Sequence, residues 1–182
     1  MAKSLAGQFL LASPTLIDPN FSRNVVLIAV HGDDGAMGVV LNRPSGASVA
    51  EAVPSLEQSA DALEPVFIGG PVQPSSIIFL GDYIDPSDAG LLVVDSIGFP
   101  SPDSDVQDIE SATSRRRIFA GHAGWGEGQL DAEIERVDWI TEDALAHEIF
   151  SDDPEDLWGA VLERKGGSYA LLARMPLDPS VN

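Results

Sequence analysis

Cysteine is absent from this chain of 182 residues. Its absence excludes disulfide bonds, thiolate metal sites, iron–sulfur clusters and thiol nucleophiles, so any chemistry must use oxygen and imidazole groups. Imidazoles are scarce too, because the chain has only three histidines, which are His31, His122 and His147. They are scattered, and His147-Glu148 lacks the second histidine, four residues after the first, that a metalloprotease helix carries. The sequence therefore predicts neither a metal site nor a cofactor.

Long hydrophobic runs are missing as well. No stretch of about 18 residues stays apolar, and the start around Lys3 leads to no signal-like apolar run with a small-residue cleavage site. We therefore expect no membrane segment and a cytoplasmic location. The length fits one domain, since roughly 100–200 residues is usual, and the chain shows no repeat or linker that would divide residues 1–182.

Positive charge is in short supply. Ten Lys and Arg residues face 29 Asp and Glu residues, which gives a formal net charge of −19. Such a surface repels phosphate polymers and anionic lipid headgroups. The one dense basic run, Arg115-Arg116-Arg117, is interpreted as the solvated start of a strand, with a phosphate-contacting stripe as the alternative. Direct nucleic-acid binding is thus disfavoured, and a protein or small-molecule partner is expected.

Apolar runs of strand length, bounded by glycine, proline and aspartate, recur along the chain. Residues 25–30 are continuously apolar and mostly β-branched, which is typical of a central strand covered on both faces. The turn residues in 31–35 predict a hairpin to a partner strand over 37–41. Further strands are expected over 8–12, 66–68, 77–80, 91–94, 117–120 and 168–175.

Helix-capping signals are mostly found later. Ser48 with Glu51, and Ser104 with Gln107, have capping-box spacing and predict two short helices. Apolar residues at helical spacing predict an amphipathic helix over 129–136.

Two more helices are expected towards the C-terminus. Thr141, followed by two acidic residues, is expected to cap one of them. Asp153-Pro154 predicts the start of the other, which should end at Gly166 and bury a stripe of four residues. This stripe consists of Leu157, Trp158, Val161 and Leu162. The predicted strands come first in the chain and most predicted helices come later, with hairpins in place of regular crossovers. This order predicts an α+β fold with an antiparallel sheet.

The glycine-rich segment 121–129 lies between a predicted strand and a predicted helix, where a phosphate-binding loop would sit. Its spacing fails, because Gln129 occupies the place of the third glycine and Trp125 is too large for a loop that approaches a pyrophosphate. No P-loop lysine follows a glycine loop, and no Gly-x-Ser-x-Gly elbow is present. The segment is interpreted as a glycine-permitted turn with Trp125 packed on the core.

Asn42-Arg43-Pro44 ends an otherwise apolar strand and presents a planar donor fork. A ligand is one possible partner for Arg43. The favoured interpretation is structural, with the guanidinium bonded to carbonyls of Gly69-Gly70-Pro71 or to a carboxylate.

Together these residues resemble the AlgH/YqgE family, which is widespread in bacteria. The resemblance spans nearly the whole chain as an ordered series of short motifs. They are residues 11–14, 18–26, His31, 38–44, 69–72, 121–125, 128–134, Trp139 and 178–182. The resemblance implies an α+β fold with a bifurcated, mostly antiparallel sheet that has a small closed, barrel-like part and is flanked by helices. Members of the family are often labelled transcriptional regulators.

The first functional hypothesis is a non-enzymatic binding or regulatory domain that acts through a protein or small-ligand partner. Three loops at predicted strand ends would gather to form its recognition surface. The recognition surface comprises Asn42, Arg43, Gly69, Gly70, His122, Trp125 and Gln129.

Two alternatives remain open. One is an enzyme or nucleotide-type ligand binder in which His122 acts with a carboxylate such as Glu127 or Asp131. The other is that the recurring residues only maintain an unusual fold, their glycines marking strained turns.

Overall fold

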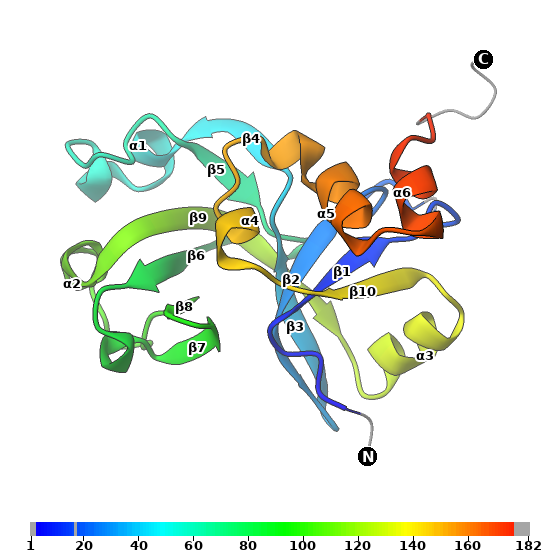
Figure 1. The fold of residues 1–182 in the computed structure, drawn as a ribbon. Coiled ribbons are helices and arrows are strands. Elements are labelled where there is room, and N and C mark those ends of the chain that lie inside the picture. The colour runs from blue at the N-terminus through cyan, green and yellow to red at the C-terminus, as the bar shows by residue number, and fades with distance from the viewer. Residues whose placement is uncertain (1–2, 17, 177–182) are drawn as a thin grey trace.

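The structure of the protein is a computed structural model that describes residues 3–16 and 18–176 (Figure 1). The closing motif at 178–182 lies outside the described residues. The strands are β1 (Gln8–Ala12), β2 (Val25–Gly32), β3 (Gly35–Val40), β4 (Pro44–Ser48), β5 (Pro65–Ile68), β6 (Val72–Tyr83), β7 (Leu91–Val94), β8 (Ile97–Phe99), β9 (Thr113–Trp125) and β10 (Trp139–Asp143). The helices are α1 (Val49–Ala52), α2 (Val106–Ala112), α3 (Gln129–Glu135), α4 (Ala146–Ile149), α5 (Leu157–Lys165) and α6 (Ser168–Ala173), with 3-10 turns η1 (Pro54–Leu56), η2 (Pro86–Asp88) and η3 (Pro154–Asp156).

The sheet branches at β9. Its main path runs β10-β1-β2-β3-β9-β6-β8-β7, and the β4–β5 pair joins it beside β9. One edge of β9 pairs with β6, whereas the other pairs first with β5 and then with β3. Every pair except β5–β9 is antiparallel. The predicted α+β fold with a bifurcated, mostly antiparallel sheet is confirmed, but the sheet of the described residues ends openly at β10 and β7 and closes no barrel.

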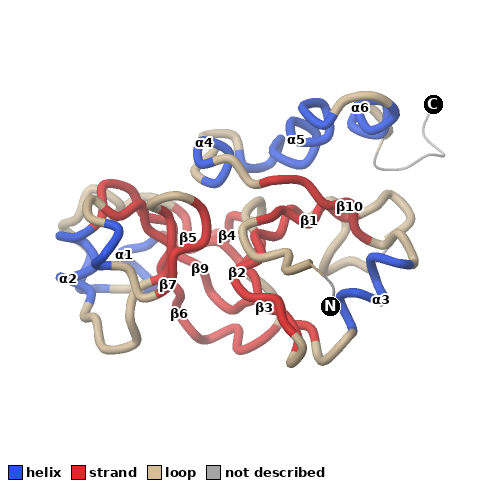
Figure 2. The backbone as a smooth tube through the Cα atoms, turned by 60° about the horizontal axis from the view of Figure 1, so that its bottom comes forward, coloured by secondary structure: helices blue, strands red, loops and turns tan. Residues whose placement is uncertain are grey.

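The helices cover the sheet in three places. Figure 2 shows α4, α5 and α6 in a row over one side of the sheet, with α5 and α6 above β1 and β10, α3 on the other side, and α1 and α2 at the far end. Each place has its own hydrophobic cluster, and the largest lies beneath α5. In the described part of the chain, none of these helices is long and apolar enough to cross a membrane.

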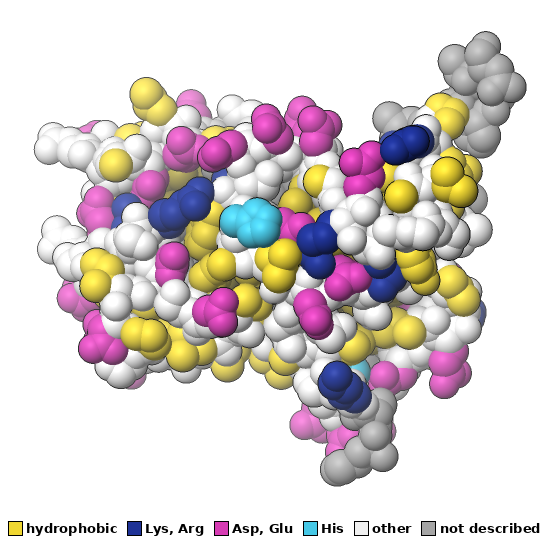
Figure 3. Space-filling model, viewed as in Figure 1, with side chains coloured by type: hydrophobic (Ala, Val, Ile, Leu, Met, Phe, Trp, Pro, Cys, Tyr) yellow, Lys and Arg dark blue, Asp and Glu magenta, His cyan; other side chains and the backbone are white. Residues whose placement is uncertain are grey.

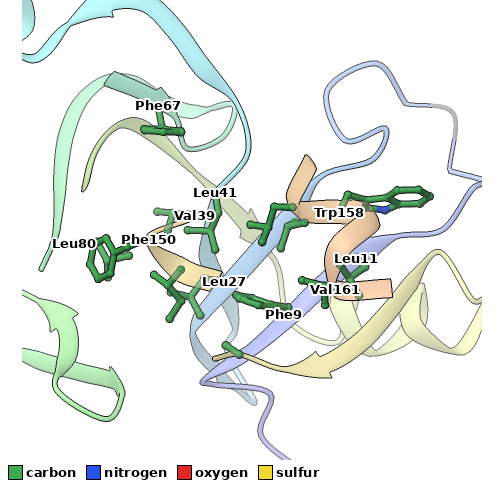
Figure 4. Packing of buried hydrophobic residues seen from close by; sticks show 14 of the residues in the cluster. Phe9, Leu11, Leu27, Val39, Leu41, Phe67, Leu80, Phe150, Trp158 and Val161 are labelled. Carbon is green, nitrogen blue, oxygen red and sulfur yellow. The ribbon is translucent and has the colours of Figure 1, made fainter. Parts of the chain in front are cut away.

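Strand β2 is the centre of the core. Residues 25–28 have no exposed surface, which confirms the central strand predicted from their continuous apolar run. Because side chains alternate along a strand, Val25 and Leu27 enter the cluster under α5, whereas Val26 and Ile28 enter the cluster beside α3. Figure 4 shows Leu27 with Phe9 and Val161 in the first of these clusters.

Local capping signals were informative at the start of α1. Ser48 and Glu51 form both hydrogen bonds of the predicted capping box. At α2 the predicted start is displaced by one residue, because Asp105, and not Ser104, accepts the hydrogen bond from Asp108 N. The shift follows from the carboxylate being as good a cap as the hydroxyl.

Two predictions in the C-terminal third are wrong. Thr141 caps no helix, since residues 139–143 form β10, in which Trp139 and Ile140 are buried and pair with β1. Residues 168–173 form helix α6 and not a strand. The segment packs against the core through Tyr169, Leu172 and Ala173. Because these residues are at helical spacing, this packing favours the helix over a strand.

Candidate functional site

The ends of three strands bring part of the predicted recognition surface together. Ile68 N donates to Arg43 O at 2.8 Å, and Gly69 N donates to Ala120 O at 2.9 Å. A Cβ on Gly70 would lie 2.2 Å from the His122 carbonyl carbon, so only glycine allows these backbones to approach. Asn42, Arg43, Gly69, Gly70 and His122 therefore lie side by side, as the loop hypothesis expects of them.

The polar groups of Asn42 and Arg43 form hydrogen bonds within the fold. Asn42 Oδ1 accepts from Val25 N and its Nδ2 donates to Arg23 O, each at 2.9 Å. Arg43 Nε donates to Asn24 Oδ1 at 2.7 Å, and its Nη2 donates to Ser22 O at 2.9 Å. These partners differ from the glycine carbonyls and carboxylates considered from the sequence. The contacts fasten the loop before β2 to the end of β3.

We expect replacement of Asn42 by alanine to lower the free energy of unfolding by about 1–3 kcal/mol, because it orphans the buried N–H of Val25. Asn42→Asp keeps the acceptor for Val25 N but sets a carboxylate oxygen against Arg23 O, so it should lower the stability as well. Urea unfolding followed by circular dichroism measures both. Unchanged stability in Asn42→Ala would leave Asn42 free for ligand recognition and contradict the structural assignment.

Trp125 and Gln129 belong to a separate cluster. Trp125 is buried, and its Nε1 donates to Glu133 Oε2 at 2.9 Å. Trp139 Nε1 donates to the same oxygen at 2.8 Å, while Gln129 Nε2 donates to Glu133 Oε1 at 3.0 Å. The two indole rings meet edge to face, with centroids 6.1 Å apart. Trp125 thus packs on the core, as interpreted from sequence, but residues 121–125 are the end of β9 and not a turn.

The histidine nearest the carboxylates of α3 is His31. Its Nδ1 accepts from Leu5 N at 3.1 Å, so Nε2 carries the proton and faces Asp131 Oδ1 at 3.5 Å. A cavity of about 500 Å³ is lined by His31, Asp131 and Glu127. His122, which the alternative hypothesis pairs with these carboxylates, lies on β9 opposite Val72 and is not among the residues lining this cavity. Among the described residues, no group of three or more His, Asp or Glu side chains is arranged to hold a metal ion.

A largely apolar cavity lies at the edge of β6. Its volume is about 510 Å³, and we call it the β6 groove. Strands β6, β7 and β8, helix α2 and the 100–104 segment contribute most of its walls, and Ala29 and Met37 complete it. None of the described residues that line it has a titratable side chain. Because a cavity of this size and composition is typical of ligand sites, the groove is a candidate binding site of the described chain.

Strand β6 presents its edge to this groove. Three successive residues, Ile77, Ile78 and Phe79, line it, although neighbouring side chains in a strand point to opposite faces. In the described residues, β8 pairs with β6 only at Gly81 and Asp82, so this stretch precedes the pairing. Opposite it lie Pro100 and Pro102, which have no N–H to donate.

A row of exposed apolar side chains extends from the groove. Ala120 on β9 is the cross-strand partner of both Ile77 on β6 and Ile68 on β5, so the three side chains share one face of the sheet. Ile68 is 50% exposed and Ile77 is 38% exposed. Ala120 packs against the core cluster that α1 and α2 cover. The row therefore extends this cluster onto the exposed surface of the sheet, and it ends beside Gly69. It therefore links the groove to the strand-end residues of the predicted recognition surface.

Sequence reasoning did not identify the groove. The sequence pattern of its residues is that of ordinary strand and core positions, and it includes no polar motif. One signal was available, because Pro100-Ser101-Pro102 cannot extend the β8 ladder and so predicts a gap beside the neighbouring strand.

The fold and groove define an α+β protein with an apolar surface cavity. The AlgH-like family model matches residues 9–170, and the chain belongs to this family. It is 41% identical to a UPF0301 protein of Mycobacterium avium, over 97% of this chain and 90% of that one. A UPF0301 protein of Chlorobium limicola is 37% identical over 97% of this chain and 95% of its own.

Two solved structures have the same fold. The crystal structure of protein DIP2367 from Corynebacterium diphtheriae matches with a TM-score of 0.84 and 28% identity, covering 94% of this chain and 93% of that one. The solution structure of the AlgH protein from Pseudomonas aeruginosa matches with a TM-score of 0.72 and 30% identity, covering 97% and 96%. The family resemblance stated from the sequence motifs is thereby confirmed.

Proposed function

We propose that this protein is a non-enzymatic binding domain that holds an extended apolar segment of a partner protein in the β6 groove. The observation that carries the proposal is a groove of about 510 Å³ in which the described residues place no titratable side chain. It lies at a strand edge that, within the described chain, has no partner strand over residues 77–79. Catalysis needs an acid, a base or an activated nucleophile, and the groove supplies none.

The free edge of β6 favours an extended peptide over a compact ligand. An added strand gains affinity from main-chain hydrogen bonds and specificity from pockets for alternate side chains. Ile77 and Leu91, at 38% and 41% exposed, are available to contact such side chains. The net charge of −19 favours a partner segment with basic flanks. A role in transcription would then act through this partner, because the same charge repels DNA phosphates.

The test uses labelled decapeptides with alternating apolar residues and lysines at both ends, and measures binding by fluorescence anisotropy. Ile77→Asp and Leu91→Asp place a charge in the groove and should each weaken binding by more than about tenfold. Leu63→Asp adds the same charge at a residue that is 93% exposed and outside the groove, so its affinity should match the wild type.

A backbone control separates strand addition from apolar contact alone. Peptides with alternate amides N-methylated keep their side chains but lose their donors, so they should not bind. Equal binding of methylated and unmethylated peptides, or of Ile77→Asp and wild type, would contradict the proposal. Saturable binding of small apolar probes in the absence of peptide binding would assign the groove to a small ligand instead.

A further inference from the structure

The three consecutive arginines of β9 line one small cavity. Arg115, Arg116 and Arg117 surround a space of about 170 Å³, between β9, the start of β5 and the segment that follows α4. It shares no residue with the β6 groove. In the described residues, β5 pairs with β9 only at Phe119 and Ala120, so the arginines precede that pairing on an open edge. Figure 3 shows how sparse Lys and Arg side chains are among the acidic ones on the face that includes β9 and α4.

Arg116 is already neutralised by the fold. Its Nε donates to Asp61 Oδ2 at 2.6 Å, and its Nη1 donates to Glu110 O and to both oxygens of Thr113. This guanidinium has a carboxylate partner and several further acceptors. The arginine run is therefore not a continuous basic stripe of the kind that contacts nucleic-acid phosphates.

Arg115 and Arg117 are different. They project from the same face of β9, and each donates one Nη2 to a main-chain oxygen, of Phe150 at 2.9 Å and of Ser151 at 3.1 Å. Their guanidinium carbons lie 5.1 Å and 4.5 Å from the centroids of the Phe150 and Phe67 rings. Within the described chain, neither has a carboxylate within 4.0 Å, whereas Arg116 does.

The positive charge of Arg117 is poorly compensated. Its Nη1 is buried without a hydrogen-bond acceptor in the described structure. Burial lowers the pKa of this guanidinium, Glu64 and Asp152 partly oppose the change, and Arg115 adds to it. Since a buried charge is costly unless it is paired, negative charge placed in the cavity would stabilise Arg117. Glu64 and Asp152 line the cavity from exposed positions and hold no charged partner within 4.0 Å there.

We propose that this cavity binds a small oxyanion between Arg115 and Arg117. The guanidinium fork suits carboxylate and phosphate groups alike, and the aromatic rings of Phe67 and Phe150 hold both forks in place. A cavity of about 170 Å³ has room for roughly five waters at about 30 Å³ each, hence for one such group. The site stands independently of the β6 groove and its peptide.

The test titrates ¹⁵N-labelled protein with sodium phosphate, sulfate or acetate, with sodium chloride holding the ionic strength constant. The Nε–H signals of Arg115 and Arg117 should shift saturably with an oxyanion and not with chloride. Phosphate and sulfate also stabilise proteins nonspecifically, so the signals report the site better than melting temperature does. The order of affinities for acetate and phosphate tells whether the natural ligand presents a carboxylate or a phosphate group.

Charge variants supply the controls. Arg115→Gln should raise the dissociation constant by about tenfold, and Glu64→Gln, which removes an opposing charge, should lower it by about tenfold. Arg136→Gln alters an exposed ion pair outside the cavity and should change nothing. No saturable shift with any oxyanion, or equal affinity in the wild type and the Glu64→Gln variant, would overturn the proposal. Far-UV circular dichroism checks that each variant is folded.

Discussion

Replacing Trp158 by alanine is expected to lower the free energy of unfolding by about 3–5 kcal/mol. The side chain of Trp158 is buried in the largest core cluster, and its Nε1 donates to Ala12 O at 3.0 Å. The Arg23 guanidinium lies 4.7 Å from the ring centroid. Truncation would leave a cavity between α5 and β1 and orphan a carbonyl in the core. Urea unfolding measured by far-UV circular dichroism gives the change.

Two further variants divide this loss into its parts. Trp158→Phe keeps most of the ring but loses the hydrogen bond to Ala12 O, so we expect a loss of about 1–2 kcal/mol. Leu171→Ala, in the neighbouring α6, removes a side chain that is 68% exposed and should change stability by less than about 0.5 kcal/mol. If Trp158→Ala cost no more than Leu171→Ala, α5 would not be part of the cooperative core.

The importance of α5 could be predicted from sequence, because its apolar stripe stands out. Leu157, Trp158, Val161 and Leu162 are all buried, as predicted. The β2–β3 hairpin was equally clear, since a continuous apolar run and a glycine turn agree on one structure. In both cases the local pattern and the tertiary environment favour the same conformation.

Where the two disagree, the tertiary environment decides. Thr141 and the acidic residues after it favour a helix start locally, but pairing along β1 buries Trp139 and Ile140 on opposite faces of the sheet. Short segments carry too little intrinsic preference to outweigh such burial. Residues 168–173 form a helix that packs against α5, and their alanines and leucines favour a helix, which the strand prediction overlooked.

The candidate site shows the same limit in its polar residues. Motif reasoning selected Asn42, Arg43 and Trp125 as conspicuous, and the structure gives each a hydrogen-bonded role in the fold. The acceptors could not be predicted, because Asn24 and Glu133 lie 19 and 8 residues from their donors. The β6 groove was hidden for the opposite reason, as an apolar residue looks the same in a sequence whether it is covered or left open.

Glu133 holds two tryptophan side chains in place through one carboxylate. One carboxylate oxygen accepts the indole N–H of both Trp125 and Trp139, at 2.9 and 2.8 Å. Glu133→Ala leaves two indole donors of buried side chains without this acceptor, and each orphaned donor costs about 1–3 kcal/mol. We therefore expect a loss of about 2–6 kcal/mol in the free energy of unfolding, measured by urea denaturation with tryptophan fluorescence.

The neighbouring Glu135 provides the matched control, because it lies on the same helix, is exposed, and should tolerate alanine within about 0.5 kcal/mol. A double-mutant cycle then isolates the hydrogen bond. Once Trp125→Phe has removed one donor, Glu133→Ala should cost about 1 kcal/mol less than it does in the wild type. Additive losses would mean that water satisfies the Trp125 indole when Glu133 is absent. Because Trp125 and Gln129 both bind Glu133, a coupled loss would establish that this end of the predicted recognition surface is held in place by α3.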